Sequence, residues 1–367
     1  MLLTISWISV IAILIMTLFI LIYKVRLSKS IKLIAFVMLG LALGYIAYDT
    51  LPGIGDDLYR YNIILDDMYL LGKDFFEKYS YFGEISIIEY YFFIFSNPVL
   101  KRFLPVVTVF IFYSILFYIF YKENIKLRKD DNNLNKNSIL MYIVLIVSCI
   151  FFRKIVSCIR YFLAFAILVL AFYRDYVEGK TNITTIILYI ISGLLHYCVI
   201  PFIIIRVIFN KKFKLLKYKW IVLIMPIIVM FILKSNIFND VLLLNTMINK
   251  FEFYTSNQTV DVKLMFMQIV LWFVLFAWTN NILKQNLRKT EKDYIQFYQI
   301  ILITMITFLF VPEFFTRYFE LICLLSFPIL CRIKLNKNNP TNLIFYSTTI
   351  LIFAYQITDI LNNWKFY

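Results

Sequence analysis

Residues 183–209 read ITTIILYIISGLLHYCVIPFIIIRVIF, an apolar run of 27 residues that contains His196, the one histidine of the chain. A helix of about 20 residues crosses the hydrocarbon core of a bilayer, so this run suits either one long tilted helix or two short helices. The choice decides the fold, because it sets the side of a membrane on which every later segment lies.

The composition of the whole chain is that of an integral membrane protein. Hydrophobic residues make up 62% of the 367 residues, charged residues make up 16%, and the mean hydropathy is +0.80. Soluble domains carry roughly 45–50% apolar and ~25% charged residues. Apolar stretches near span length recur along the chain with no soluble domain-sized interval between them. This pattern predicts one all-α, polytopic domain over residues 1–367.

Hydropathy predicts about 11 to 12 transmembrane helices. The first of them has no basic residue before it and a Lys/Arg cluster after it, so we expect a retained span rather than a signal peptide. The predicted spans are residues 5–23, 31–49, 103–121, 138–152, 156–173, 183–196, 198–209, 220–234, 263–283, 295–311, 314–331 and 341–360.

Charge decides between one helix and two in residues 183–209. The positive-inside rule places the basic segments in the cytoplasm, which requires residues 183–209 to go out and come back. With Arg206 included, 24 Lys/Arg and 7 Asp/Glu then lie inside, and 13 Lys/Arg and 15 Asp/Glu lie outside. We therefore predict a broken pair of short helices around His196, with Pro201 just past the bend and both termini outside. The basic segments are 24–32, 122–137, 174–181, 210–219, 284–293 and 332–340.

This topology predicts two long outer loops. Residues 50–102 are acidic, aromatic and too interrupted for a span, so we expect amphipathic helices in the outer interface. Residues 235–262 form the second outer loop. His196 falls at the outer tip of the broken pair, where irregular backbone is tolerated only if it is buried in protein or lines a wet cavity.

Ionisable residues near membrane depth are costly and are therefore candidate functional groups. In FFRKIVSCIRYFLAFA (151–166), Arg153 and Arg160 are spaced to stack on one helix face about 10 Å apart. Two guanidinium groups suit a diphosphate, although Arg153 also fits a side chain that snorkels to the headgroups. Arg317 begins the penultimate span and is a third candidate, although Glu313 and Glu320 also fit an ion-pair set within its helix.

The first outer loop supplies candidate sugar contacts, because carboxylates accept hydrogen bonds from hydroxyls and aromatic rings stack on pyranose faces. Any polar interfacial loop carries such residues too. The candidates are Asp56, Asp57, Tyr59, Tyr61, Glu84 and Glu89.

The sequence predicts no metal, cofactor or nucleic acid. Adjacent carboxylates at Asp56 and Asp57 diverge by ~100° on a helix. Five cysteines form no C-x-x-C, and one histidine leaves no zinc or haem site. The net charge of +15 comes without a basic stripe with interleaved aromatics outside the apolar runs.

In this order, four features resemble the EpsG family of bacterial exopolysaccharide polymerases, which is related to the Wzy polymerases of O-antigen and capsule synthesis. The chain differs at Tyr161, where a glutamine is usual, and Glu84 or Glu89 is a loose counterpart of the family's Glu-Pro. The resemblance covers most of the chain and rests on the acidic-aromatic segment with Asp56, Tyr59 and Tyr61, on IRYFLA with Arg160 and Ala164, on GLLHYCVI with His196, and on Arg317, Tyr318 and Phe319.

The resemblance implies a GT-C-like glycosyltransferase of the bacterial cytoplasmic membrane. Glycan on undecaprenyl diphosphate is the expected donor, and a repeat unit on a second such lipid is the expected acceptor. A flippase and a chain-length regulator of the same pathway are expected partners. The reaction needs cations where charge develops on the diphosphate and a base near the acceptor hydroxyl.

The candidate residues divide between these tasks. Arg160 and Arg317 are expected to hold diphosphate, with Arg153 in support. His196 is either the base or a donor to phosphate. Asp56, or one of Glu84 and Glu89, is the competing base. The other expected substrate contacts are Asp57, Tyr59, Tyr61 and Tyr318.

Other functions fit the same features. A flippase or transporter of lipid-linked oligosaccharide also needs internal cations, but it is expected to show two related halves and midplane polar residues. An O-antigen-type ligase has nearly the same requirements as a polymerase. A membrane O-acyltransferase would need its histidine near the cytoplasmic side, and a purely structural partner would use the arginines as anchors.

Overall fold

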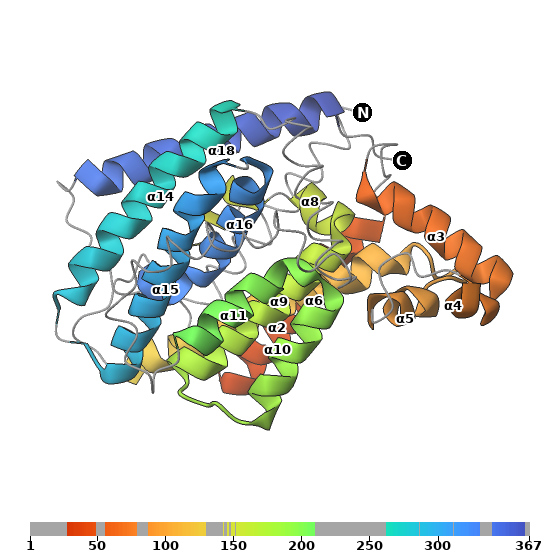
Figure 1. Ribbon diagram of the computed structural model, residues 1–367, viewed down its shortest axis with the longest axis horizontal. Coiled ribbons are helices and arrows are strands. Elements are labelled where there is room, and N and C mark those ends of the chain that lie inside the picture. The colour runs from red at the N-terminus through yellow and green to blue at the C-terminus, as the bar shows by residue number, and fades with distance from the viewer. Residues whose placement is uncertain are drawn as a thin grey trace, which may run out of the picture.

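The computed structural model describes most of the chain from residue 28 onward, and within that part all regular structure is helical (Figure 1). The all-α class is thereby confirmed. The described residues are 28–48, 56–78, 87–129, 142, 145–146, 148–150, 152–209, 262–285, 287–310, 312–330 and 340–363. The predicted spans 5–23 and 220–234, nearly all of loop 235–262, and Glu84 lie outside them.

The helices follow the apolar runs of the sequence closely. They are α2 (Lys29–Tyr48), α3 (Asp57–Leu71), α4 (Asp74–Lys78), α5 (Ile87–Ile94), α6 (Phe103–Lys129), α8 (Phe152–Ser157), α9 (Ile159–Phe172), the π-helix η1 (Tyr173–Val177), α10 (Ile183–Leu195), the 3₁₀ helix η2 (Tyr197–Val199), α11 (Ile200–Ile208), α14 (Val262–Leu283), α15 (Lys289–Thr307), the 3₁₀ helix η5 (Phe308–Phe310), α16 (Pro312–Leu325), α17 (Phe327–Leu330) and α18 (Pro340–Asn363).

Two helices of the described part are long and apolar enough to cross a membrane, namely Phe103–Glu123 within α6 and Val262–Leu283. Shorter apolar helices occupy Leu33–Tyr48, Ile183–Leu195 and Tyr197–Ile208. These helices are consistent with a membrane protein. The number of spans, the single domain, the two outer loops and the sides of the termini remain predictions.

Helix α9 lies at the centre of the fold. Eleven of its 14 residues are buried, as expected for a helix that is apolar all round. It packs against α6 on one side and α10 on another, while α14, α15 and α18 lie beyond it and α3, α4 and α5 project from one end (Figure 1).

Helices α2 and α6 approach each other closely through two glycines four residues apart. A Cβ atom at Gly44 would lie 2.8 Å from the backbone oxygen of Val106, and one at Gly40 would lie 3.0 Å from Oγ of Ser114. Small residues at this spacing let helices pack backbone to backbone, a common arrangement in membranes. The glycines therefore explain why α2 and α6 form the most extensive helix pair of the described part.

The stretch that contains His196 forms two helices. Helix α10 ends at Leu195, and α11 begins at Ile200 with Pro201 in its first turn, where the fixed φ of proline is already helical. Tyr189 of α10 and Arg206 of α11 both donate to Oδ2 of Asp175. Because these two residues lie on opposite sides of the turn, the helices must fold back beside each other. They form a hairpin with His196 at its tip.

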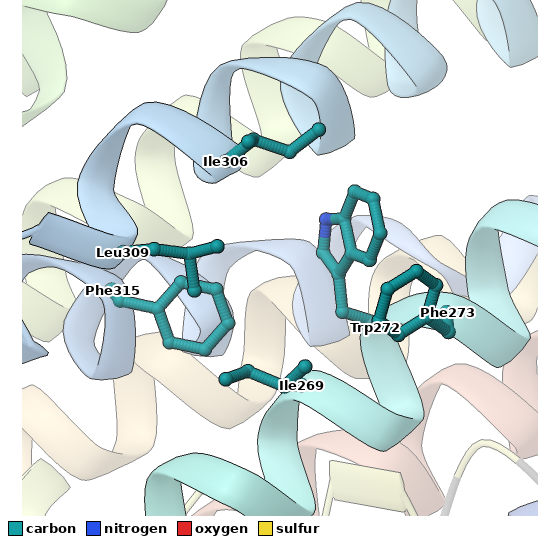
Figure 2. Close-up of a pocket in the computed structure, with 6 residues that line it drawn as sticks. All are labelled: Ile269, Trp272, Phe273, Ile306, Leu309 and Phe315. Carbon is teal, nitrogen blue, oxygen red and sulfur yellow. The ribbon is translucent and has the colours of Figure 1, made fainter.

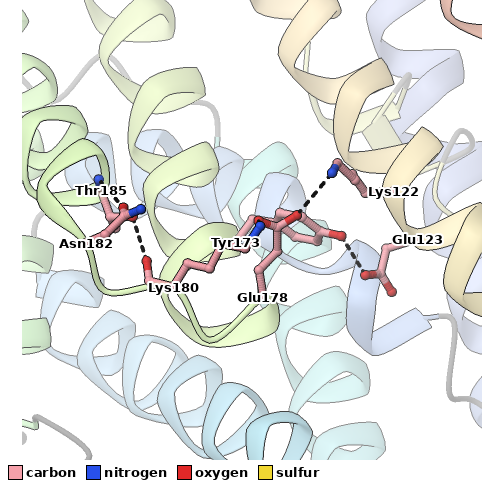
Figure 3. A network of polar contacts seen from close by, with 7 residues as sticks. All are labelled: Lys122, Glu123, Tyr173, Glu178, Lys180, Asn182 and Thr185. Carbon is pink, nitrogen blue, oxygen red and sulfur yellow. Dashed lines mark hydrogen bonds and ion pairs between the residues drawn. The ribbon is translucent and has the colours of Figure 1, made fainter.

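The open end of the hairpin carries a set of interacting polar residues, several of them buried, which we call the open-end network. The π-turn at the end of α9 places Asp175 against the hairpin, and Tyr173 donates to Oε1 of Glu123 over 2.8 Å. Figure 3 shows Tyr173 and Glu178 between the end of α6 and the start of α10. The network comprises Lys122, Glu123, Tyr173, Asp175, Glu178, Lys180, Thr181, Tyr189 and Arg206.

Candidate functional site

Charged and aromatic side chains from five segments meet near the tip of the hairpin, and we call this set the tip cluster. The segments are the start of α3, α8, the start of α9, the turn at His196 and the middle of α16. The members are Asp56, Tyr61, Arg153, Lys154, Cys158, Arg160, Tyr161, His196, Arg317 and Glu320.

Arg153 and Arg160 do not stack on one continuous helix, which corrects the expectation from their spacing. Helix α8 ends at Ser157, Cys158 has φ −90° and ψ 54°, and α9 begins after it. Cys158 keeps a backbone bond to each helix, since its N–H donates to the carbonyl of Lys154 and its carbonyl accepts from the N–H of Phe162. The bend turns the two arginines toward different residues of α3.

Arg153 forms an ion pair with Asp56, which directly precedes α3. Its Nη2 lies 3.1 Å from Oδ1 and 3.4 Å from Oδ2 of the carboxylate. Both side chains keep some exposure to solvent. The pair therefore forms the accessible rim of the tip cluster and joins α3 to α8.

Arg160 meets the hydroxyl of Tyr61, one and a half turns further along α3. Burial raises the pKa of Tyr61, and the hydrogen bond and positive charge of Arg160 act in the opposite direction without cancelling it. Tyr61 is therefore protonated at neutral pH. Its hydroxyl is therefore a neutral neighbour of the permanently charged Arg160. An anionic ligand can take the place of this hydroxyl beside the guanidinium.

Tyr161 contacts both Arg317 and His196. Its hydroxyl donates to the backbone carbonyl of Arg317, and the Arg317 guanidinium lies 5.8 Å from the centre of its ring. The same ring meets His196 edge to face at 6.0 Å. In the sequence, Tyr161 stands out only as a difference from the family pattern. Its position next to Arg160 was the one signal that could have marked it.

His196 caps the short turn that follows it. Its Nδ1 accepts a hydrogen bond of 3.1 Å from the N–H of Cys198. An imidazole nitrogen that accepts carries no proton, so in the neutral ring the proton is on Nε2. In this arrangement His196 offers a donor to a ligand, which favours the phosphate-donor alternative over the base.

Glu320 pairs across the helix interface. Its side chain is only 1% exposed, and its Oε1 accepts from Nζ of Lys154 over 2.9 Å. The sequence suggested an ion-pair set within α16, and the described partner on α8 was not foreseen. The side chain of Glu313 lies outside the described residues.

The surroundings of the Cys158 thiol link these contacts into a single site. The charges of Arg317, Lys154, Glu320 and Asp56 all act on the sulfur of Cys158. Those of Arg317 and Arg160 act on Cys198, in the turn after His196. The structure thus brings together Asp56, Tyr61, Arg153, Arg160, His196 and Arg317, which all were candidates from the sequence.

The remaining candidates lie in other surroundings. Asp57 pairs with Arg60 in its own helix, and residue Tyr59 is 39% exposed. Glu89 is buried in α5. Tyr318 is buried among Phe202, Phe308 and Phe314, with ring centres 4.7 to 6.0 Å away, so it packs α16 rather than offering an open ring.

An apolar cavity of about 150 Å³ lies between α14, the end of α15 and α16. Figure 2 shows six side chains around it, none of which is charged. Phe315 faces this cavity, and Arg317 lies two residues further, about 200° around the helix. Helix α16 therefore separates the cavity from the tip cluster. The lining residues are Ile269, Trp272, Phe273, Ile306, Leu309 and Phe315.

An apolar, all-helical body with cations gathered at one end is the design of a helical membrane protein. The chain belongs to the EpsG family, whose model matches residues 33–367. This membership associates the chain with membrane-bound polysaccharide biosynthesis of the glycosyltransferase type. No curated protein and no solved structure matches it.

Proposed function

We propose that the protein is a polysaccharide polymerase. It joins oligosaccharide repeat units carried on undecaprenyl diphosphate by glycosyl transfer at the outer face of the bacterial cytoplasmic membrane. The observation that supports this most is the tip cluster, which gathers Arg153, Lys154, Arg160 and Arg317 and in which the ring of Tyr161 contacts His196.

Glycosyl transfer from a lipid diphosphate develops negative charge on the leaving group, and preorganised cations stabilise that charge. Arg160 and Arg317 hold the diphosphate in this proposal, because a guanidinium can donate two parallel hydrogen bonds to phosphate oxygens. His196 adds the N–H at Nε2. Arg153 supports them from the rim once the ligand competes with Asp56.

The glycan lies along the start of α3 in this proposal. Asp57 and the half-exposed Tyr59 line that side, and Tyr61 gives up its place beside Arg160 to the diphosphate. Tyr318 supports Arg317 through packing in α16 rather than by stacking on sugar. A flippase and a chain-length regulator would be partners in the same membrane.

The test is the surface polysaccharide of a strain that lacks the gene and carries a complementing copy. Arg160→Lys and Arg317→Ala, at membrane levels equal to wild type, should leave single repeat units in place of long polymer. Lysine fails at Arg160 because a point charge replaces a fork of donors. Arg288→Ala is the control, since that side chain is 63% exposed and pairs with Glu291 at the start of α15, outside the tip cluster. It should restore full-length polymer.

The phenotypes separate this function from its rivals. Accumulation of lipid-linked repeats with no glycan at the surface would support a flippase and overturn the polymerase. Long polymer that stays on its lipid carrier would support a ligase. Full-length polymer from Arg160→Lys would remove Arg160 from the diphosphate site.

A further inference from the structure

The ion pair between Glu320 and Lys154 has an unusual position. The carboxylate is almost fully buried, while the lysine side chain is 35% exposed, so the pair runs from the protein interior to the surface of the tip cluster. A buried carboxylate is costly unless it is paired and hydrogen-bonded, and a pair of this kind adds little stability compared with apolar packing. Its presence inside a cluster of cations therefore points to chemistry as much as to folding.

Glu320 faces the groups that we assign to the diphosphate. It follows Arg317 by three residues on α16, which puts both on one side of the helix. Its charge acts on Tyr161, whose ring contacts His196, and on Cys158, which Arg317 also influences. The charged and titratable groups near Glu320 are Lys154 from α8, Cys158 and Tyr161 from the start of α9, and Arg317 and Cys323 from α16.

The other base candidates of the cluster are engaged differently. The base needs a lone pair that can take a proton, and Nδ1 of His196 already accepts from Cys198 while Nε2 carries the ring proton. Asp56 sits at the exposed rim with both oxygens toward Arg153. Glu320 lies deeper, with Lys154 on Oε1.

We infer that Glu320 is the general base of the glycosyl transfer, an inference that rests on the proposed function. The proton of the acceptor hydroxyl moves to the Glu320 carboxylate, and the oxygen forms the new bond to the anomeric carbon. The bond from that carbon to the diphosphate oxygen breaks, and its electron pair leaves with the diphosphate beside Arg160 and Arg317. Lys154 keeps its proton and holds the carboxylate in place. Glu320 then returns the proton to water.

The experiment uses the full-length protein in lipid vesicles, with lipid-linked repeat units extracted from the deletion strain as donor and acceptor. We expect Glu320→Gln, which keeps the shape and an oxygen for Lys154, to slow transfer about 100-fold or more. Binding of the lipid-linked repeats should stay within about twofold of wild type. In wild type, the transfer rate should fall at acid pH because the base becomes protonated. The residual transfer rate of Glu320→Gln should not show this fall.

Lys154→Gln gives a second and independent readout. It removes the cation beside Glu320 and leaves the carboxylate, so the acid fall of the rate should move to higher pH by about one unit. Asp66→Asn is the matched control, because that carboxylate is 56% exposed and pairs with Lys101 outside the tip cluster, and its pH profile should follow wild type.

The outcomes distinguish the base from the wider function. Suppose that the wild-type protein lengthens the glycan. If Glu320→Gln then transfers at the wild-type rate, or if its rate still falls at acid pH, Glu320 is not the base. An unmoved profile in Lys154→Gln would do so even if Glu320→Gln failed to fold. No lengthening by wild type in any preparation would instead refute the polymerase.

Discussion

The two ends of the α10–α11 hairpin both bury charge, and they accommodate it in different ways. At the open end, the fully buried Asp175 accepts hydrogen bonds from Arg206, from Tyr189 at 3.0 Å and from Thr181 at 2.6 Å. At the tip, the buried Glu320 likewise pairs with Lys154, but Arg160 meets the neutral hydroxyl of Tyr61 and Arg317 lies over an aromatic ring.

The two arrangements indicate which end holds the fold and which end is suited to a ligand. A buried carboxylate that accepts hydrogen bonds from a cation and two hydroxyls loses several strong contacts if it is displaced from this position. A guanidinium beside a tyrosine can exchange that neighbour for a phosphate and gain a charge-assisted bond. We therefore expect changes at the open end to lower the amount of folded protein and changes at the tip to lower polymer formation.

The largest effect on stability should come from Asp175→Ala. The substitution leaves Arg206, whose side chain is 10% exposed, without its buried carboxylate partner. Removing one partner of such a pair costs about 3–5 kcal/mol. The thermal unfolding midpoint of the detergent-purified protein and its level in the membrane should both fall steeply.

The double variant Asp175→Ala with Arg206→Met is the control for this prediction. It removes both charges, and apolar replacement of a buried pair is often nearly neutral. Most of the lost stability should return. If the losses of unfolding free energy from the two single substitutions simply add in the double variant, the ion pair does not hold the hairpin closed. The contrast between the two ends is then wrong.

Matched Tyr→Phe substitutions should give an intermediate effect that differs between the ends. Tyr173→Phe removes a 2.8 Å donor from Glu123, a carboxylate that is only 1% exposed, at a cost of about 1–3 kcal/mol. Tyr61→Phe removes a hydroxyl that faces a cation with several other donors, so the unfolding midpoint should shift less. Polymer length should respond to Tyr61→Phe and stay normal in Tyr173→Phe at equal protein level. A larger loss of stability from Tyr61→Phe would reverse the assignment of the ends.

The helices themselves could be predicted from the sequence, because apolar runs of span length set their positions. The run predicted at 263–283 is α14 from Val262, and the run predicted at 31–49 is α2 to Tyr48. The bend at Cys158 could not be predicted in this way. It depends on one backbone angle, and no proline or glycine marks the position.

The candidate cations could be predicted because charge in an apolar chain stands out, and Arg153, Arg160 and Arg317 all reach the tip cluster. Their partners could not. After Arg160, helix α9 is apolar on every side, so its pattern hardly fixes how it is rotated, and the rotation decides that Tyr161 meets a histidine 35 residues away. The pairing of Lys154 with Glu320 likewise depends on how α8 and α16 face each other.

The smallest effect on stability, and the sharpest test of the tip, comes from two substitutions of Tyr161. Tyr161→Phe removes the bond to the Arg317 carbonyl but keeps the ring against Arg317 and His196, so stability should change by about 1 kcal/mol and polymer should remain long. Tyr161→Leu also removes the ring. Because a cation–π contact of this kind contributes about 0.5–2 kcal/mol, transfer should slow by about 2- to 30-fold while the protein stays folded. Equal transfer rates in the two variants would show that the ring does not position Arg317 and His196, and loss of folded protein from Tyr161→Leu as large as that from Asp175→Ala would show that the tip holds the fold as the open end does.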